Sequence, residues 1–172
     1  MDSYQAVSQL LISHPNHFHT LTQTPVTFHY NNGSHSLRFT RPILHLMSPH
    51  SLTTPYPFPS SSLPTSLDFS NLRIFYSPPF QSVLQIHPDK VGPFYKALHT
   101  LTQLFESPDL VHKIRLESGS CAVFFNRRIL HGRTHFDEKL GGNRYFRGTY
   151  VGLDEFYDRF RVLSSKLKKE IQ

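Results

Sequence analysis

The sequence predicts one domain of mixed β structure with flanking helices, and three observations lead to this prediction. Several short segments are rich in β-branched and aromatic residues, and turn sequences separate them: Asn-Asn-Gly at 31–33 and Gly-Gly-Asn at 141–143. Two segments, 93–105 and 153–169, carry apolar residues at helical spacing. The length of 172 residues suits one ordinary domain, so we treat residues 1–172 as a single unit of fold.

The composition narrows the class of protein. Hydrophobic residues make up 38% of the chain and charged residues 17%, and both fractions are low for a compact domain. The numbers of prolines (13) and histidines (12) are high. We therefore expect a chain that is partly loop, or incomplete. One cysteine, Cys121, excludes an internal disulfide. No apolar run approaches the roughly 18 residues of a membrane span, and the start lacks the features of a secretory signal. We expect a soluble intracellular protein, cytoplasmic or mitochondrial, without a membrane partner.

The net charge of +6 raises the question of nucleic-acid binding. Lysines and arginines are scattered along the chain, and they cluster only at Lys166, Lys168 and Lys169 near the end of the last helix. Basic residues are favourable at a helix C-terminus, because they complement its dipole. The net charge is the only feature of the sequence that favours nucleic-acid binding. We therefore expect no nucleic-acid partner.

The first half of the chain predicts a short helix and a hairpin. Apolar residues at helical spacing indicate a helix over 2–12, which His14-Pro15 ends. Segments 26–30 and 36–46 are rich in β-forming residues and flank the turn at 31–33. His17 and His19 would share one side of a strand, but no carboxylate stands near them and residues 20–24 resemble a loop, so we interpret them as non-ligands.

A long loop follows the hairpin. Residues 48–71 contain five prolines among many serines and threonines, a composition that neither packs nor pairs easily, so we expect a Pro/Ser-rich loop within the domain. A strand over 72–76 comes next, ended by Ser-Pro-Pro-Phe at 77–80. Residues 87–92 are interpreted as the loop leading into a helix that begins with Pro93.

Residues 121–150 hold most of the chemistry that the sequence suggests. An alternating segment at 111–116 and a turn at 117–120 lead into a β-forming run at 123–125. His131 stands after the apolar pair at 129–130, and an aromatic segment over 144–151 is predicted to run back as a paired strand. That pairing would place Arg144 near His131. The helix over 153–169 has one apolar stripe and oppositely charged ends, so we assign it packing and no chemistry.

This arrangement resembles the C-terminal part of the TauD/TfdA-like dioxygenases, and in particular their gamma-butyrobetaine and trimethyllysine dioxygenases. Their motif is similar to Asn-x-Arg-x-Leu-His-Gly-Arg, followed about a dozen residues later by Arg and Gly-x-Tyr. The matching residues here are Asn126, Arg128, Leu130, His131, Gly132, Arg133, Arg144, Gly148 and Tyr150.

The resemblance implies a role for four of these residues. His131 would be the distal histidine ligand of a non-haem Fe(II), for which neutral imidazole is a suitable ligand. Arg144 would pair with the distal carboxylate of the co-substrate 2-oxoglutarate, because a planar guanidinium meets a carboxylate with two hydrogen bonds; Arg133 would add to the electrostatics of this cofactor site. Tyr150 would offer an aromatic face to a quaternary ammonium, a contact worth roughly 0.5–2 kcal/mol. Ascorbate is the expected auxiliary reductant.

The resemblance also implies a fold, and it implies that part of this fold and two iron ligands are missing from the chain. The fold would be a double-stranded β-helix, a jelly-roll of the clavaminate synthase-like kind, with its N-terminal strands missing, so that residues 1–172 form the C-terminal portion of the domain. In such enzymes a His-x-Asp pair, well before the segment that matches Met1 to Leu11, supplies the other two iron ligands. His87-Pro88-Asp89 has this form, but its proline and its place before a helix argue against it.

Two functional hypotheses follow. The first is a dioxygenase that hydroxylates a small trimethylammonium-bearing substrate such as gamma-butyrobetaine or trimethyllysine, of the carnitine biosynthesis type, incomplete because the His-x-Asp pair is absent. The second is a truncated, non-catalytic paralogue that acts as an interaction module. Either is compatible with a homodimer. Whether the family is enzymatic and whether this chain is active are separate questions, because facial iron coordination needs all three protein ligands.

Overall fold

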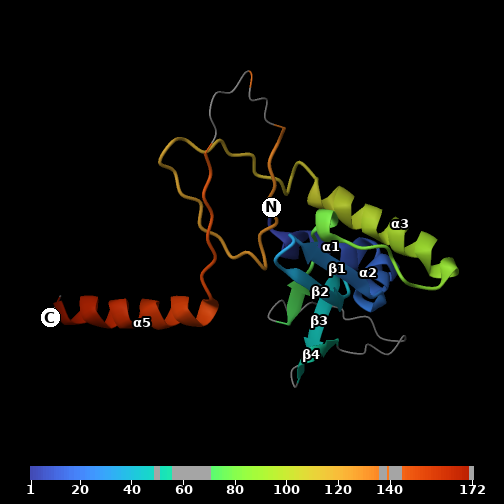
Figure 1. The fold of residues 1–172 in the computed structure, drawn as a ribbon, viewed down its shortest axis with the longest axis horizontal. Helices are drawn as coiled ribbons and strands as arrows, with labels where there is room; N and C mark the ends of the chain where they lie inside the picture. The colour runs from blue at the N-terminus through green and yellow to red at the C-terminus, as the bar shows by residue number, and fades with distance from the viewer. Residues whose placement is uncertain (49–50, 56–70, 136–138, 140–144, 171–172) are drawn as a thin grey trace. The chain divides into compact units, whose positions relative to one another are not determined.

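The computed structural model describes residues 1–48, 51–55, 71–135, 139 and 145–170. The chain divides into two compact units, Met1–Gly132 and Arg133–Gln172. The first holds three α-helices and a short 3-10 helix, η1 (Pro78–Phe80), with two small antiparallel sheets, and the second holds the helix over Leu153–Glu170 (Figure 1). Each unit is described by itself.

Helices α1 (Ser3–Ser13) and α2 (Pro15–Gln23) follow each other directly. The Tyr4 N–H donates to the Asp2 carboxylate over 3.1 Å and starts α1, so the predicted helix over 2–12 is confirmed. Pro15 ends α1 and takes the first position of α2. The loop-like structure predicted for residues 20–24 is wrong for 20–23, because Phe18 and Leu21 give this segment a buried helical face.

The predicted hairpin is confirmed. Strands β1 (Val26–Asn31) and β2 (Ser36–Arg41) pair antiparallel, with Val26 opposite Arg41 and Asn31 opposite Ser36. In the turn, the Gly33 N–H donates to the Asn31 side chain over 3.1 Å, and Gly33 has a φ of +83°, a conformation that glycine adopts without steric cost.

A second sheet has the order β4-β3-β5, made of β3 (Leu44–Ser48), β4 (Ser51–Pro55) and β5 (Leu72–Ile74). The strand predicted over 36–46 is thus two strands, separated at Pro42, which has no N–H to donate to a ladder. The predicted long loop over 48–71 is wrong for β4, which pairs with β3; residues 49–50 and 56–70 lie outside the described part. The strand predicted over 72–76 is confirmed as β5 in its first three residues.

One apolar core joins these elements. It takes residues from α1, α2 and α3 (Pro88–Phe105), from β1, β3 and β5, and from the residue that precedes β3. Its fully buried large members are Phe18, Phe94, Leu10, Leu21, Ile43, Leu44, Leu72, Leu101, Val7 and Val26. Each such side chain contributes about 1.5–3 kcal/mol of favourable transfer free energy, so the three helices and the sheets are fixed to one another within this unit.

Helix α3 begins earlier than the sequence predicts. Pro88 takes its first position and His87 precedes it, whereas Pro93 lies inside the helix. An internal proline removes one backbone hydrogen bond, at a cost of about 3 kcal/mol in an exposed helix. Here Phe94, Ala97 and Leu101 are buried, and this packing holds the helix together on both sides of Pro93. The prediction of a loop over 87–92 is therefore wrong from Pro88 onward.

Residues 106–132 contain no strand, although strands were predicted over 111–116 and 123–125. The predicted turn is confirmed: the Ser120 N–H donates to the Glu117 carbonyl over 3.0 Å, and Gly119 has a φ of +83°. A strand needs a hydrogen-bonded neighbour, and no described residue supplies a ladder to 111–116 or 123–125. The structure thus shows small antiparallel sheets and helices, and the expected jelly-roll is not evident in the residues that it describes.

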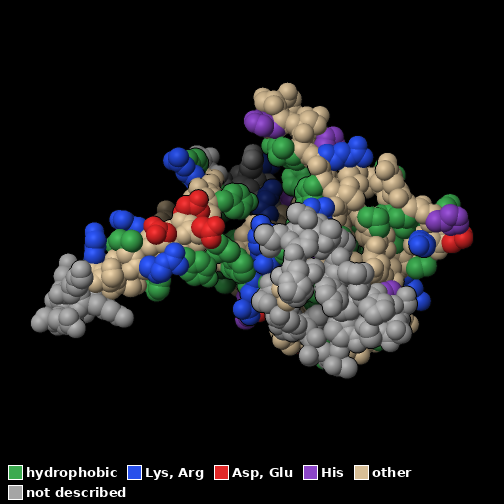
Figure 2. All heavy atoms as spheres, turned by 90° about the horizontal axis from the view of Figure 1, so that it is seen from below, with side chains coloured by type: hydrophobic (Ala, Val, Ile, Leu, Met, Phe, Trp, Pro, Cys, Tyr) green, Lys and Arg blue, Asp and Glu red, His purple; other side chains and the backbone are tan. Residues whose placement is uncertain are grey.

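In the second unit, α5 (Leu153–Glu170) confirms the predicted terminal helix, with Asp154 and Glu155 in its first turn. Its predicted apolar stripe is exposed at every member, namely Leu153, Phe156, Tyr157, Phe160, Leu163 and Leu167. Figure 2 shows hydrophobic side chains at the surface of this helix among acidic and basic ones. The described part of the segment predicted as a strand over 144–151 has no strand. No helix among the described residues is long and apolar enough to cross a membrane.

Candidate functional site

The backbone that precedes His131 is attached to the start of α1. A turn forms first, in which the N–H groups of Arg128 and Ile129 both donate to the Phe125 carbonyl, over 3.0 and 2.9 Å. Ile129 then forms an isolated antiparallel bridge with Asp2. The Ser3 N–H donates to the Arg128 carbonyl over 3.0 Å. Residues far apart in sequence therefore meet beside the candidate ligand.

Side chains reinforce this attachment. The Arg128 Nε lies 3.1 and 3.0 Å from the two Asp2 carboxylate oxygens, and its Nη2 donates to Oδ2. The guanidinium also lies over the Tyr4 ring, with Cζ 5.4 Å from the ring centroid. Hydrogen bonding to Arg128 lowers the pKa of the Asp2 carboxyl below its usual range, and the same contact raises the pKa of Arg128. The pair is charged at neutral pH.

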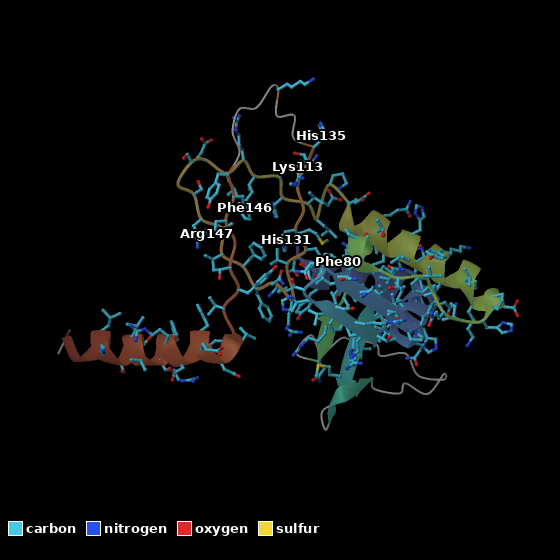
Figure 3. All side chains as sticks on the ribbon, viewed as in Figure 1. Phe80, Lys113, His131, His135, Phe146 and Arg147 are labelled. Atoms are coloured by element: carbon cyan, nitrogen blue, oxygen red, sulfur yellow. The ribbon has the colours of Figure 1, made fainter. Side chains whose placement is uncertain are left out.

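His131 comes two residues after Ile129 and is exposed. Its Nδ1 lies 3.4 Å from the Ile129 carbonyl oxygen, and its ring centroid lies 4.6 Å from that of Phe124, with the planes tilted by 54°. If Nδ1 carries the proton toward that carbonyl, Nε2 keeps its lone pair for a ligand. Figure 3 shows His131 on the segment beside the N-terminal end of α1. The ring is accessible to a metal ion or to solvent.

The other predicted site residues belong to the second unit. Arg133 and Tyr150 are exposed there, and Arg144 lies outside the described residues. The Gly-Gly-Asn turn predicted at 141–143 also lies outside them. The roles predicted for these three side chains remain predictions.

Two His-x-Asp sequences bear on the missing iron ligands. His87 Nδ1 lies 3.2 Å from an Asp89 carboxylate oxygen, and both side chains are largely exposed, at 69% and 87%, at the start of α3. A second pair, His135-Phe136-Asp137, stands four residues after His131 and was not among the ligands predicted from the sequence. His135 is exposed and Asp137 lies outside the described residues. A search for His-x-Asp in the full sequence would have found it.

The described residues do not make a complete iron site. Among them no three His, Cys, Asp or Glu side chains come close enough to hold a metal ion. A facial triad needs two histidines and a carboxylate on one ion, and His131 supplies one of these three. The described residues therefore supply one of the three protein ligands that the implied iron needs.

Sequence reasoning also missed Asp2 and its contact with Arg128. An aspartate before an apolar-periodic run is a helix N-cap signal, so its capping role could have been found. Its partner lies 126 residues away, and no local pattern indicates a contact over that distance.

The motif around His131 is the feature by which the sequence resembles a class of dioxygenases. The family model described as "Taurine catabolism dioxygenase TauD, TfdA family" matches residues 1–150. The chain therefore belongs to the TauD/TfdA dioxygenase family, as the sequence predicts. The family implies a double-stranded β-helix, whereas the described residues show two small antiparallel sheets and helices.

Individual relatives carry dioxygenase names. The chain is 30% identical over 169 residues to "Dioxygenase str8" of Strobilurus tenacellus, covering 94% of this chain and 35% of the relative. It is 31% identical over 165 residues to gamma-butyrobetaine dioxygenase of a Pseudomonas species, covering 95% and 37%. Trimethyllysine dioxygenase of Meyerozyma guilliermondii is 26% identical over 164 residues, with the same coverage of 95% and 37%. The chain thus spans a little over one third of the length of these relatives.

Proposed function

We propose that this chain carries the distal-histidine and co-substrate part of an Fe(II)- and 2-oxoglutarate-dependent dioxygenase. The proposed reaction couples the oxidative decarboxylation of 2-oxoglutarate to succinate with hydroxylation of an aliphatic C–H bond. The observation that carries the proposal is the family match over residues 1–150, which spans His131, Arg144 and Tyr150. The names of two relatives favour a trimethylammonium-bearing substrate of the gamma-butyrobetaine or trimethyllysine kind, as in carnitine biosynthesis.

Each proposed role follows from the chemistry of the side chain. His131 would bind iron through Nε2, and Arg144 would form two parallel hydrogen bonds with a 2-oxoglutarate carboxylate. Arg133 would add positive charge for the dianionic co-substrate. Tyr150 would attract the substrate cation by its aromatic face. Ascorbate would keep the iron reduced.

The proposal includes that the described residues of this chain do not supply the His-x-Asp pair with which His131 would complete an iron site. Two observations support this. The surface pair at His87 and Asp89 stands at a helix start, and the described residues contain no three-ligand group. The chain also spans little more than a third of the length of its relatives, so most of a relative's length has no counterpart here.

Binding of 2-oxoglutarate is the first test. We expect calorimetry with the purified chain and Fe(II) to show binding that Arg144→Ala abolishes and Arg127→Ala leaves intact. Arg127 is a suitable control because it is an exposed arginine of the same charge. If neither 2-oxoglutarate binding nor its conversion to succinate occurs with Fe(II) and ascorbate, the proposal fails for this chain.

Turnover is the second test, and it identifies the ligands. We expect little succinate from the chain alone, since one protein ligand leaves iron weakly bound and its geometry undefined. Robust turnover that His131→Ala abolishes would instead show that the chain holds a full site. The double variants His87→Ala/Asp89→Ala and His135→Ala/Asp137→Ala would then show which pair supplies it, because only loss of the true ligand pair abolishes turnover.

A non-catalytic interaction module is the second candidate. The observation that favours it is the presence of a single implied iron ligand among the described residues, together with the exposed apolar stripe of α5. This function predicts no response to 2-oxoglutarate or Fe(II) in the wild-type chain. The binding experiment therefore separates the two candidates.

A further inference from the structure

We propose that Asp2 and Arg128 are positioning residues, which fix the backbone that carries His131 to the start of α1. This inference rests on the proposed function, because it concerns how the proposed iron ligand is held. Neither residue needs to touch iron, co-substrate or substrate. They act through the backbone of residues 128–130.

Among the described residues, the segment before His131 is attached to the start of α1 and to no sheet. Residues 123–125 belong to no strand, and so the turn at 125–129 has no ladder to hold it. The attachments that the structure shows are to the start of α1: the Leu130 N–H donates to the Met1 carbonyl over 3.1 Å, and the Ser3 hydroxyl and N–H both donate to the Arg128 carbonyl. His131 follows immediately, so its Cα position depends on these contacts.

Helix α1 is a rigid support for this segment. Its inward face is buried in the core through Ala6, Val7, Leu10 and Leu11, and the helix packs on α2 and α3. Moving the start of α1 would disturb this packing, because protein cores tolerate little displacement. A segment tied to Asp2 and Ser3 is therefore tied to the core.

The Asp2 carboxylate joins both parts. It accepts the Tyr4 N–H, which starts the helix, and it accepts the Arg128 guanidinium over two oxygens. A planar guanidinium fixes both distance and orientation in such a contact, whereas an ammonium fixes distance alone. The Tyr4 ring beneath the guanidinium restricts it further. One carboxylate thus couples the helix start to the turn before His131.

Of the two neighbouring arginines, only Arg128 takes part in the contact with Asp2. Both arginines are exposed and lie on the same turn, but only Arg128 contacts Asp2 and Tyr4. Both side chains carry one positive charge. Arg127→Lys is therefore a matched control for Arg128→Lys, since each keeps the charge and replaces a planar fork with an ammonium.

The experiment measures amide hydrogen exchange and imidazole dynamics by NMR on the full chain. Asp2→Asn and Arg128→Lys should each speed exchange of the Leu130 and Ser3 amides by about threefold to fivefold, with the Leu10 and Leu101 amides of the core changing less than about twofold. Relaxation of the His131 ring carbons should show greater mobility in the same two variants. Arg127→Lys should match the wild type in every readout.

The variants also guard against a folding defect. Asp2→Asn removes the charge of the ion pair and keeps a side-chain oxygen that can cap α1, and Arg128→Lys leaves Asp2 itself in place. Unchanged Leu130 exchange in Arg128→Lys overturns the proposal. Faster Leu130 exchange together with unchanged relaxation of the His131 ring carbons overturns the proposal as well, because the ion pair would then have only a structural role.

Failure of the proposed function gives a different result. In that case the wild-type chain binds no 2-oxoglutarate, while the exchange and ring measurements still report whether Asp2 and Arg128 hold His131. If 2-oxoglutarate does bind, Arg128→Lys should weaken this binding in proportion to the gain in His131 mobility, and Arg127→Lys should not.

Discussion

Asp2 and Arg128 form an ion pair across 126 residues of sequence, with the Arg128 Nε 3.1 and 3.0 Å from the two carboxylate oxygens of Asp2. Asp2 also caps α1, whereas Arg128 ends a turn whose next residues lead to His131. The contact therefore combines two roles, one in the stability of a helix and one in the placement of a candidate ligand. The two roles have different energies, and substitutions can separate them.

Asp2→Ala is expected to destabilise the first unit more than Arg128→Ala does. Loss of an N-cap side chain costs about 0.5–2 kcal/mol. An ion pair whose side chains are half and one-third exposed is screened by water, and contributes about 0–1 kcal/mol. Urea denaturation of the two single variants and of the double variant measures both effects. Equal losses in the two single variants would contradict the capping role.

The same carboxylate predicts an acid dependence. Hydrogen bonding to Arg128 lowers the pKa of Asp2 in the folded state, so the unfolded state binds more protons as the pH falls. The stabilisation is present above the unfolded pKa of about 3.9 and is lost as the pH falls through the lower folded pKa. Stability measured from pH 6 to pH 2 should fall less steeply in Asp2→Asn than in the wild type. Parallel curves for the two proteins would refute this prediction.

His17 predicts a second pH dependence, at a higher pH. Burial lowers the pKa of His17, and the neighbouring His14 and Lys96 lower it further. The His14 and His17 rings stack with centroids 5.4 Å apart, and within the described structure the buried His17 Nδ1 has no hydrogen-bond partner. Protonation would place a charge on this ring beside two other basic groups.

The lowered pKa of His17 sets the direction in which stability changes with pH. The unfolded chain takes up a proton near the ordinary histidine pKa of about 6.5, whereas the folded chain does so at lower pH. The His17 contribution is therefore complete above about pH 6.5 and is lost as the pH falls through the folded pKa. In His17→Phe the fall in thermal unfolding temperature between pH 7.5 and 5 should be smaller than in the wild type, and His19→Phe serves as a control. An equal fall in both variants would show that His17 is not responsible.

Local patterns explain which elements could be predicted from the sequence. The β1–β2 hairpin follows from Asn-Asn-Gly between two β-forming segments, and α1 and α5 follow from apolar residues at helical spacing. The family and His131 as its candidate ligand follow from the motif around residues 126–150. In each case the information lies within a short stretch of chain.

Elements that depend on distant partners could not be predicted in this way. Residues 123–125 have strong β propensity, but no described segment pairs with them, and a strand exists only with its neighbour. The start of α3 could fall at either of two prolines, and packing of the helix against the core decides for Pro88. The contact between Asp2 and Arg128 joins opposite ends of the first unit, and no spacing in the sequence reports it.

Leu101→Ala tests the core that supports α1. Leu101 is fully buried on α3, so truncation leaves a cavity as well as losing transfer free energy. The expected cost is about 2–5 kcal/mol. Leu37→Ala on β2 is a control, because Leu37 is 60% exposed and its truncation should cost well under about 1 kcal/mol. Chemical denaturation of both variants measures the difference, and similar costs would mean that Leu101 is not a core residue.

Two glycines should respond differently to substitution by alanine. Gly119 has a φ of +83°, a conformation that strains any residue with a Cβ, and so Gly119→Ala should destabilise the turn at 117–120 by about 1 kcal/mol. Gly92 lies inside α3 directly before Pro93, whose ring disfavours the helical conformation for a preceding residue that has a Cβ. Gly92→Ala should therefore gain less than the about 0.5–1 kcal/mol that alanine usually gains over glycine inside a helix. Urea denaturation of both variants measures the two effects, and a gain of about 1 kcal/mol in Gly92→Ala would show that the Pro93 ring imposes no such cost.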